Sequence, residues 1–334
     1  MNGVSVIICC YNSSDKLPET LYHISQQQLT AELPVEVILV DNGSTDTTCA
    51  VASAYWEQVK APYPLRIISE TIPGKNYAIE TGISAAAYDL ILFCDDDNLL
   101  SADYIQRGYT YFLQHPALGL LGGFGIPRLT IAPPPWFERY AYQYALGPQH
   151  TRARRDITLE RGYVYGAGSI LKKEAYLTLK KKGFQYTLTG RRNGIIIPGE
   201  DNELGYAVSL IGYQIHSNPE LTFIHVLSES RLTWAYIKRL KKSVAYSAAL
   251  LIPYKERRNE RLLNKKSTFS WTKKMLSECF YFLNGYVRYP FAATDFKTDI
   301  VLDRQARLGS IQSLFANRKL FINKHSWLPW LQSN

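Results

Sequence analysis

The stretch LILFCDDDN at residues 90–98 joins four consecutive apolar residues to a run of three aspartates. Residues 90–93 have the length and the unbroken apolar character of a strand that is buried on both faces. Asp95, Asp96 and Asp97 follow where this strand ends, and three adjacent carboxylates repel one another unless a cation compensates them. The alternative is a solvated acidic turn before the next helix, and the strand that precedes the aspartates makes it the less favoured interpretation.

The same pattern, an apolar run that ends in polar residues, recurs along the first 125 residues. Besides residues 90–93, strands are expected at 4–10, 35–40 and 65–68 and from 118 to 121. Helical periodicity separates them, at residues 17–28, after Thr45 or Asp46, at 76–86 and at 102–113. Apolar strands that alternate with helices predict an α/β fold, with a mostly parallel central sheet covered by helices on both faces.

The second half of the chain is less regular. The expected elements are a rigid loop at 133–136, a strand at 164–171, a Gly- and Arg-rich loop at 183–199, a helix at 202–211 and a strand at 221–225. The composition then changes, because residues 231–274 contain 13 basic and only 2 acidic side chains. These basic residues lie on predicted helices and indicate a basic, mainly helical C-terminal extension.

The net charge of +9 hides an asymmetry between the two halves of the chain. Residues 1–150 carry 7 Lys and Arg against 15 Asp and Glu, whereas residues 151–334 carry 31 against 14. An acidic half argues against a uniformly basic coat for nucleic acid, and no nucleic-acid-binding module is recognisable. We therefore expect no nucleic-acid partner.

The cysteines and the apolar runs indicate in which cellular compartment the protein is expected. The five cysteines are odd in number and have no metal-site spacing, which is typical of reduced thiols. Residues 1–11 lack the basic start of a signal peptide, and no apolar stretch approaches the ~18–20 residues of a membrane span. The sequence predicts a cytoplasmic protein, with peripheral attachment to the inner face of the membrane as an option.

Ligands of open α/β sheets bind at the carboxyl ends of the strands. Here those ends carry Tyr11 and Asn12, Asp41, residues 70–75 and residues 95–97. The first strand is followed by neither the G-x-G-x-x-G of dinucleotide-binding enzymes nor a Walker A loop. A nicotinamide enzyme and a P-loop enzyme are therefore disfavoured.

Five segments carry a resemblance to a known family. They are VSVIICCYNS (4–13), VILVDNGSTD (37–46), GKNYAI (74–79), FCDDDN (93–98) and GEDNEL (199–204). In this order they are similar to the motifs of family 2 glycosyltransferases, which have the Rossmann-like GT-A fold. Residues 166–168 and 231–234 also resemble family segments, and the resemblance fades beyond about residue 235.

The resemblance implies a division of the chain and a set of donor-binding residues. Residues 1–125 would form the nucleotide-sugar-binding half, 126–230 the acceptor-binding half and 231–334 the extension. The implied nucleotide-sugar-binding residues are Cys10, Tyr11, Asn12, Asp41, Lys75, Asn76, Asp95 and Asp96. A divalent cation, Mg²⁺ or Mn²⁺, would be held by Asp97 with Asp95 and His225. Turn capping by Asp41, a solvated Lys75 and a structural His225 remain alternatives.

Glycosyl transfer also needs a base that takes the proton of the acceptor hydroxyl. The resemblance assigns this role to Asp201, with Glu200 beside it, and the dipole of the predicted helix would hold the carboxylate ionised. A single displacement implies inversion at the anomeric carbon. Trp136, Arg191 and Arg192 are acceptor-site candidates, and packing or solvated loops are their alternatives.

Residues 232–251 form a further candidate, a basic amphipathic helix. Tyr236, Leu240 and Val244 lie on one stripe, continued by Ala248 and Leu251, and lysines flank it. Such a helix fits an anionic membrane surface or an acidic acceptor, and equally a core helix with a solvated face. In either case we expect the basic segment to lie apart from the donor site.

Together these features predict a metal-assisted, inverting transferase. The donor is a nucleotide sugar, preferably a UDP-sugar, the acceptor is a saccharide or a lipid-linked hydroxyl, and the setting is surface polysaccharide or glycan synthesis. A nucleotidyltransferase of related fold and a catalytically silent nucleotide- or carbohydrate-binding protein are the alternatives.

Overall fold

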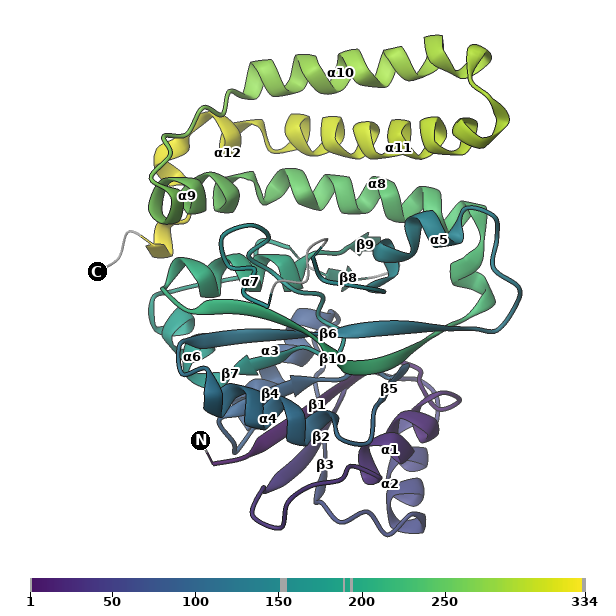
Figure 1. Ribbon diagram of the computed structural model, residues 1–334, viewed down its shortest axis with the longest axis vertical. Coiled ribbons are helices and arrows are strands. Elements are labelled where there is room, and N and C mark those ends of the chain that lie inside the picture. Colours follow the sequence, from purple (N-terminus) through teal and green to yellow (C-terminus); the bar gives the residue numbers. More distant parts are fainter. Residues whose placement is uncertain (1, 151–154, 189, 193–194, 332–334) are drawn as a thin grey trace.

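The computed structural model of the protein describes residues 2–150, 155–188, 190–192 and 195–331, with the backbone alone for 190–192, 195–196, 295 and 325. The strands of its main sheet are β1 (Val4–Cys10), β2 (Val35–Asp41), β3 (Leu65–Ser69), β4 (Leu90–Phe93), β5 (Asn98–Leu100), β6 (Leu118–Leu129), β7 (Ile170–Lys172) and β10 (Gln214–Leu227). They are ordered β3-β2-β1-β4-β7-β6-β10-β5 in the described part of the chain. Only β5 and β7 run antiparallel to their neighbours, so the predicted mostly parallel sheet is confirmed (Figure 1).

Helices cover both faces of this sheet, as the alternating pattern predicted. The helices of the sheet region are α1 (Leu17–Ser25), α2 (Thr48–Gln58), α3 (Lys75–Ala85), α4 (Tyr104–Gln114), α5 (Phe137–Tyr140), α6 (Lys173–Lys181) and α7 (Glu200–Leu210). Helices α1, α2 and α4 bury their apolar side chains in one core, and α3, α6 and α7 bury theirs in the core of the opposite face. Strand β1 lies between β2 and β4, with Val4 opposite both Val35 and Leu90, which explains its unbroken apolar sequence.

The second half differs from the prediction at two places. Of the predicted strand 164–171 only β7 is formed, because Gly168 adopts a φ of +67° and turns the chain before Ser169. The predicted loop 183–199 contains a short antiparallel hairpin of β8 (Gly190–Arg192) and β9 (Ile195–Ile197).

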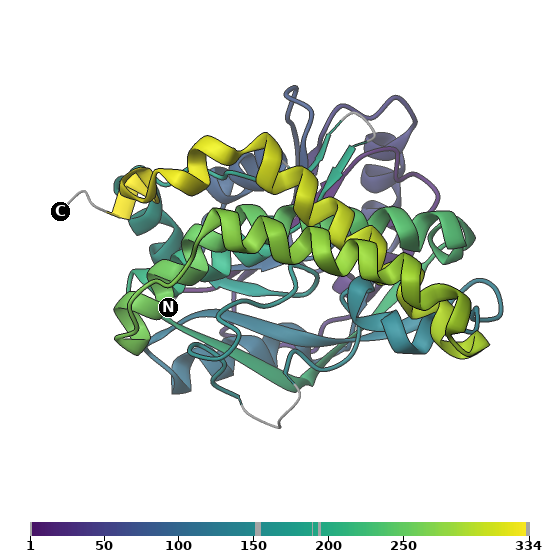
Figure 2. The same cartoon turned by 90° about the horizontal axis from the view of Figure 1, so that it is seen from above.

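The C-terminal extension is helical, as predicted. It consists of α8 (Trp234–Leu250), α9 (Ile252–Leu263), α10 (Trp271–Arg288), α11 (Thr294–Ala316) and α12 (Arg318–Ile322). Helix α8 lies over the sheet region, α11 packs on α8, and α10 is outermost (Figures 1 and 2). In the described chain no helix is both long and apolar enough to span a bilayer.

The apolar stripe of α8 faces inward, so its predicted role at a membrane surface is wrong. Leu240 is buried in a core shared with α5, and Tyr236 and Val244 pack against the same core. Leu251, at the end of the stripe, is also buried. A stripe that is covered by protein cannot contact lipid, and the alternative of a core helix is the one that the structure shows.

Candidate active site

A cavity of about 680 Å³ opens at the carboxyl ends of β1 and β4. Its floor comes from these strand ends, and its other walls come from the first turns of α3 and α7 and from α8. The predicted residues that line it are Cys10, Tyr11, Lys75, Asp95, Asp96, Asp97, Glu200, Asp201 and His225. Segments that are more than 200 residues apart in the sequence therefore share one site.

Each of the three aspartates has its own cationic neighbour. Asp95 accepts from Lys75 Nζ at 2.7 Å, and Asp96 accepts from Lys16 Nζ at 2.8 Å. Asp97 lies 3.1 Å from Arg231 Nη2. The repulsion expected within the aspartate run is thus balanced by side chains of this protein, and the less favoured alternative, a solvated acidic turn, is not formed.

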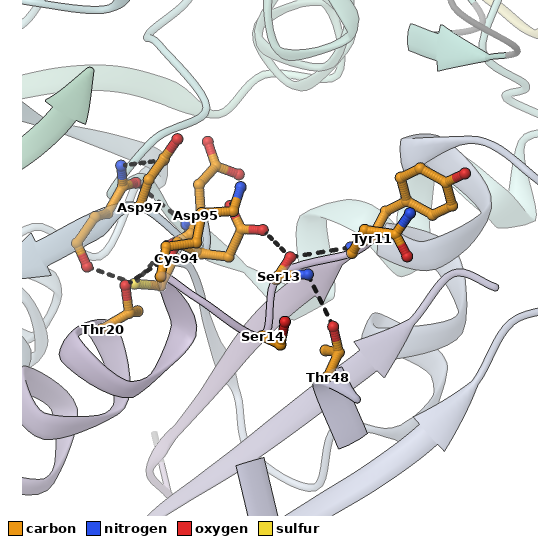
Figure 3. Close-up of polar contacts among 12 residues, drawn as sticks. Tyr11, Ser13, Ser14, Thr20, Thr48, Cys94, Asp95 and Asp97 are labelled. Atoms are coloured by element: carbon orange, nitrogen blue, oxygen red, sulfur yellow. Dashed lines mark hydrogen bonds and ion pairs between the residues drawn. The ribbon is translucent and has the colours of Figure 1, made fainter. Parts of the chain in front are cut away.

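Ser13 and Thr20 fix the position of Asp96 by hydrogen bonds. Ser13 Oγ donates to the Asp96 carboxylate, and its backbone N–H donates to Thr48 Oγ1 at 2.8 Å (Figure 3). Thr20 Oγ1 donates to the backbone carbonyl of Asp96 at 3.0 Å. The turn that follows β1 and the helix α1 therefore hold the aspartate turn in place at the end of β4.

Burial and charge set the protonation of this cluster. Burial raises the pKa of all three carboxyl groups. At Asp95 the charge of Lys75 more than offsets burial, and the pKa lies below the usual range. At Asp97 the contacts with His225 and Arg231 do the same, and its pKa is also lowered. At Asp96 burial outweighs Lys16 and Ser13, and its pKa is raised. Within the aspartate run, Asp95 and Asp97 are therefore the two carboxyl groups whose ionised form the surroundings favour.

His225, at the end of β10, lies beside both Asp97 and Arg231. Its Nδ1 lies 2.9 Å from the carbonyl oxygen of Tyr144, which only accepts, so Nδ1 carries the proton. Its Nε2 lies 3.1 Å from Arg231 Nη1, which only donates, and 3.5 Å from Asp97 Oδ1. This tautomer is the one that a histidine needs in order to bind a metal ion.

A divalent cation fits the donor chemistry of this corner. Carboxylate oxygens with one imidazole suit Mn²⁺ or Mg²⁺. Among the described residues, however, no group of three His, Cys, Asp or Glu side chains is already gathered around one point. Arg231 stands beside Asp97 and His225, so a bound ion would replace the contact that this guanidinium makes.

Asp201 lies in the first turn of α7 and also lines the cavity. Gly199, with a φ of +113°, starts the helix, a backbone angle that favours glycine. Asp201 Oδ2 accepts from the Gly166 N–H and Oδ1 from the Asn202 N–H, both at 2.8 Å. Residues 166–168, in place of the predicted strand, thus orient the carboxylate.

The predicted effect of the helix dipole on Asp201 is outweighed. Burial and the charge of Glu200 raise the pKa of Asp201 to about 6, against the two backbone hydrogen bonds and Lys75. A carboxylate of this pKa is ionised at neutral pH and still basic enough to accept a proton. Oε2 of Glu200 is buried and finds no hydrogen-bond partner within the described residues.

Four of the predicted residues do not line the cavity. Asn12 caps the turn after β2 through its contact with the Thr45 N–H, and Asp41 accepts from the Ser44 N–H. Asn76 donates to the carbonyl of Leu188, and Trp136 packs 6.3 Å from Trp234. Their predicted contacts with ligands remain predictions. The side chains of Arg191 and Arg192 lie outside the described residues.

Several cavity residues were missed by the sequence analysis. Lys16 and Arg231 pair with the aspartates, while the rings of Tyr144 and of Tyr236 on α8 stack 6.0 Å apart and line the cavity. We expected the basic segment to lie apart from the donor site. This prediction is wrong for the start of the segment, because Arg231 and Tyr236 line the cavity. Arg231 stood in a segment that resembles the family, and that was the one available signal.

Comparisons with known proteins agree with this geometry. Residues 5–179, just over half of the chain, match the family described as Glycosyl transferase family 2. The poly-beta-1,6-N-acetyl-D-glucosamine synthase of Staphylococcus epidermidis is 27% identical over 125 residues, which are 37% of this chain and 28% of that protein. The synthase of Staphylococcus aureus strain MSSA476 is 25% identical over 123 residues, with the same two coverages. The match thus spans less than a third of these relatives.

Solved structures are similar over nearly the whole chain. Residues 1–349 of TarS from S. aureus, in complex with UDP-GlcNAc, superpose with a TM-score of 0.51 at 14% identity, covering 95% of this chain and 91% of that one. A mannosyltransferase from Pyrobaculum calidifontis, in complex with GDP-Man and Mn²⁺, gives a TM-score of 0.58 at 15% identity and coverages of 94% and 87%. Likeness at such identity concerns the fold, which is GT-A, as predicted. Together with the match over residues 5–179, it shows that the chain belongs to glycosyl transferase family 2.

Proposed function

We propose that this enzyme transfers a sugar from a nucleoside-diphosphate donor, preferably a UDP-sugar, to a hydroxyl group of a saccharide or lipid-linked acceptor. The observation that carries the proposal is that Asp201 and the aspartate run line the same cavity. Asp201 offers a basic carboxylate, and Asp95, Asp97 and His225 offer donor atoms that suit a divalent cation. The TarS complex with UDP-GlcNAc supports a uridine nucleotide as donor. Because the similar mannosyltransferase was solved with GDP-Man, guanosine donors should also be tested.

Asp201 is the general base of the proposed reaction. It takes the proton of the acceptor hydroxyl while the oxygen attacks the anomeric carbon, and the bond from that carbon to the diphosphate breaks. One displacement inverts the configuration. The N–H groups of Gly166 and Asn202 hold the carboxylate in a fixed orientation, so that little reorganisation is needed at the moment of transfer.

Lys75, Lys16 and Arg231 prepare the donor side. Their three positive charges balance the aspartates in this structure, so they leave no surplus charge for an incoming diphosphate. A divalent cation held by Asp97, Asp95 and His225 would supply that charge and stabilise the leaving diphosphate. Lys75, at the start of α3, lines the cavity and would contact the diphosphate as a point charge.

The setting that we propose is the synthesis of surface polysaccharide or lipid-linked glycan. It is supported by the relatives that are named as poly-beta-1,6-N-acetyl-D-glucosamine synthases. An N-acetylglucosamine donor is therefore the first one to test.

The proposal is tested by donor turnover with and without metal. Purified enzyme is incubated with UDP- and GDP-sugars and Mg²⁺ or Mn²⁺, and released nucleotide is measured. We expect metal-dependent release from one donor and a loss of roughly 100-fold or more in Asp97→Ala, because the leaving group is no longer stabilised. Asp103→Ala, which removes a carboxylate at the start of α4, is the matched control and should act like the wild type. Turnover of no donor, or full activity of Asp97→Ala, would refute the proposal.

A further inference from the structure

Helix α10 turns its apolar side away from the protein. Leu276, Phe280, Leu283 and Val287 follow one another at helical spacing and are 66%, 64%, 62% and 66% exposed. They form a continuous stripe on the outermost helix of the molecule (Figures 1 and 2). Single exposed apolar residues are ordinary, but a stripe of this length is the mark of a surface that meets another apolar phase.

The inward side of α10 carries a buried ion pair and a close-packed glycine, besides Trp271 and Met275, which pack on the main core, and these contacts fix its orientation. Glu278 is 3% exposed and is bound by Lys274 at 2.7 Å and by Arg307 of α11 at 3.2 Å. Gly285 is also buried, and a Cβ there would meet the side chain of Arg304 at 2.6 Å. A rotation that hid the apolar stripe would expose these close contacts and would separate Glu278 from Arg307.

The apolar surface continues around the turn between α10 and α11. Phe291, in the connection, is 87% exposed, and Phe296 at the start of α11 is 60% exposed. Tyr281, Tyr286 and Tyr289 lie along the same hairpin and are partly exposed. Phenylalanine and leucine with bordering tyrosines are the composition of segments that lie in the interfacial layer of a bilayer.

The charge around the stripe favours an anionic surface as its partner. Within residues 271–288 the cations are Lys273, Lys274 and Arg288, and the one acid is the buried Glu278. Residues 231–334 carry 20 Lys and Arg against 6 Asp and Glu. A symmetric contact with a second copy would place these cations against one another, without carboxylates to balance them.

We propose that α10 and the turn after it bind the surface of an anionic lipid bilayer, with the helix in the plane of the membrane. The stripe of Leu276, Phe280, Leu283 and Val287 enters the apolar layer, and Lys273 and Arg288 contact lipid phosphates. The proposed membrane contact is therefore on α10 and not on α8, because protein covers the apolar stripe of α8. The cavity lies on the sheet side of α8, so α11 and α8 separate it from the bound membrane.

Vesicle sedimentation with the purified full chain tests the proposal. Sucrose-loaded vesicles of phosphatidylcholine with phosphatidylglycerol should bind the protein, vesicles of phosphatidylcholine alone should bind it weakly, and salt should release it. The double variant Leu276→Ser with Leu283→Ser should bind roughly tenfold or more weakly. Leu113→Ser with Leu177→Ser is the matched control, because these leucines are 52% and 53% exposed on α4 and α6. It should bind like the wild type.

The outcomes separate the lipid surface from other partners. Circular dichroism checks that both double variants keep the fold, and Lys273→Gln with Arg288→Gln tests the charge contribution without touching the stripe. The proposal is overturned if the wild type ignores anionic vesicles or if the control loses binding equally. It is also overturned if sedimentation velocity shows a dimer that the stripe variant dissociates, since the stripe is then a contact between copies.

Discussion

Asp201 shows how burial changes the chemistry of a side chain that the sequence had already located. Its place in GEDNEL and at a helix start identified it, and the helix dipole predicted an ordinary ionised carboxylate. The fold places it, partly buried, beside Glu200, and its pKa rises to about 6. The sequence could not show this shift, because the shift depends on which segments cover α7.

Arg231 is a second residue whose role needs the three-dimensional structure. It lies more than 130 residues from Asp97 in the sequence, yet its guanidinium is 3.1 Å from that buried carboxylate. Arg231→Gln should lower the free energy of unfolding by about 3 kcal/mol, because Asp97 loses a counter-charge in a buried pair. Added Mn²⁺ should restore part of this loss, since the ion supplies the missing charge.

Thermal unfolding of Arg231→Gln with and without Mn²⁺ measures both effects. Arg128→Gln, which removes an exposed ion pair with Glu19, is the control and should change the midpoint little. A midpoint of Arg231→Gln equal to that of the wild type, or no greater gain from Mn²⁺ than the wild type shows, would contradict the account of this corner.

At the scale of elements, a buried carboxylate ties the extension to the site. Glu203 on α7 accepts from the N–H groups of Thr187 and Leu188 and from the hydroxyl of Tyr254 on α9, at 2.9–3.0 Å. The carbonyl of Leu188 in turn accepts from Asn76 on α3. Helices α3, α7 and α9 are thus connected through one loop beside the cavity.

Tyr254→Phe should destabilise the protein by about 1 kcal/mol, because it removes one hydrogen bond from Glu203 while two backbone donors remain. Urea unfolding measures this change. Tyr22→Phe, at a tyrosine that is 47% exposed, should leave the midpoint unchanged. Equal midpoints for the wild type and Tyr254→Phe would show that the link through Glu203 carries no stability.

The elements that the sequence predicted best are those with the strongest local signal. The apolar runs of β1, β2 and β4 each end in the predicted polar residues, since parallel strands buried on both faces must be apolar throughout. Strand β5 was missed because it has three residues and pairs with β10, whose partner residues lie more than 120 positions later. The stripe of α8 was read correctly as apolar, but amphipathicity does not say whether lipid or protein covers it.

At the scale of the whole molecule, the extension and the sheet region share one core. Leu250, Tyr254 and Leu314 belong to the same apolar cluster as Leu204 and Ala207 of α7. The predicted boundary at residue 231 therefore marks a change of composition within a shared core. Such a core is expected to unfold in one cooperative step.

Calorimetry tests this expectation. The full chain should give a single transition whose van't Hoff and calorimetric enthalpies agree, and a chain that stops at residue 230 should give no cooperative transition, because the core beneath α8 and α9 is uncovered. Two separate transitions in the full chain, or a well-folded shortened chain, would show that the extension is an independent domain.

Asp201, as the base in the cavity that the aspartate run also lines, is the residue on which the proposed reaction depends. The most direct measurement compares the wild type with Asp201→Asn in donor binding and in donor turnover across pH. We predict that the wild-type rate rises as the pH passes through about 6, since the base must be deprotonated. Asp201→Asn should bind the donor with unchanged affinity and turn it over roughly 100- to 10,000-fold more slowly. Asp201→Asn that keeps the wild-type rate and pH profile would contradict the account.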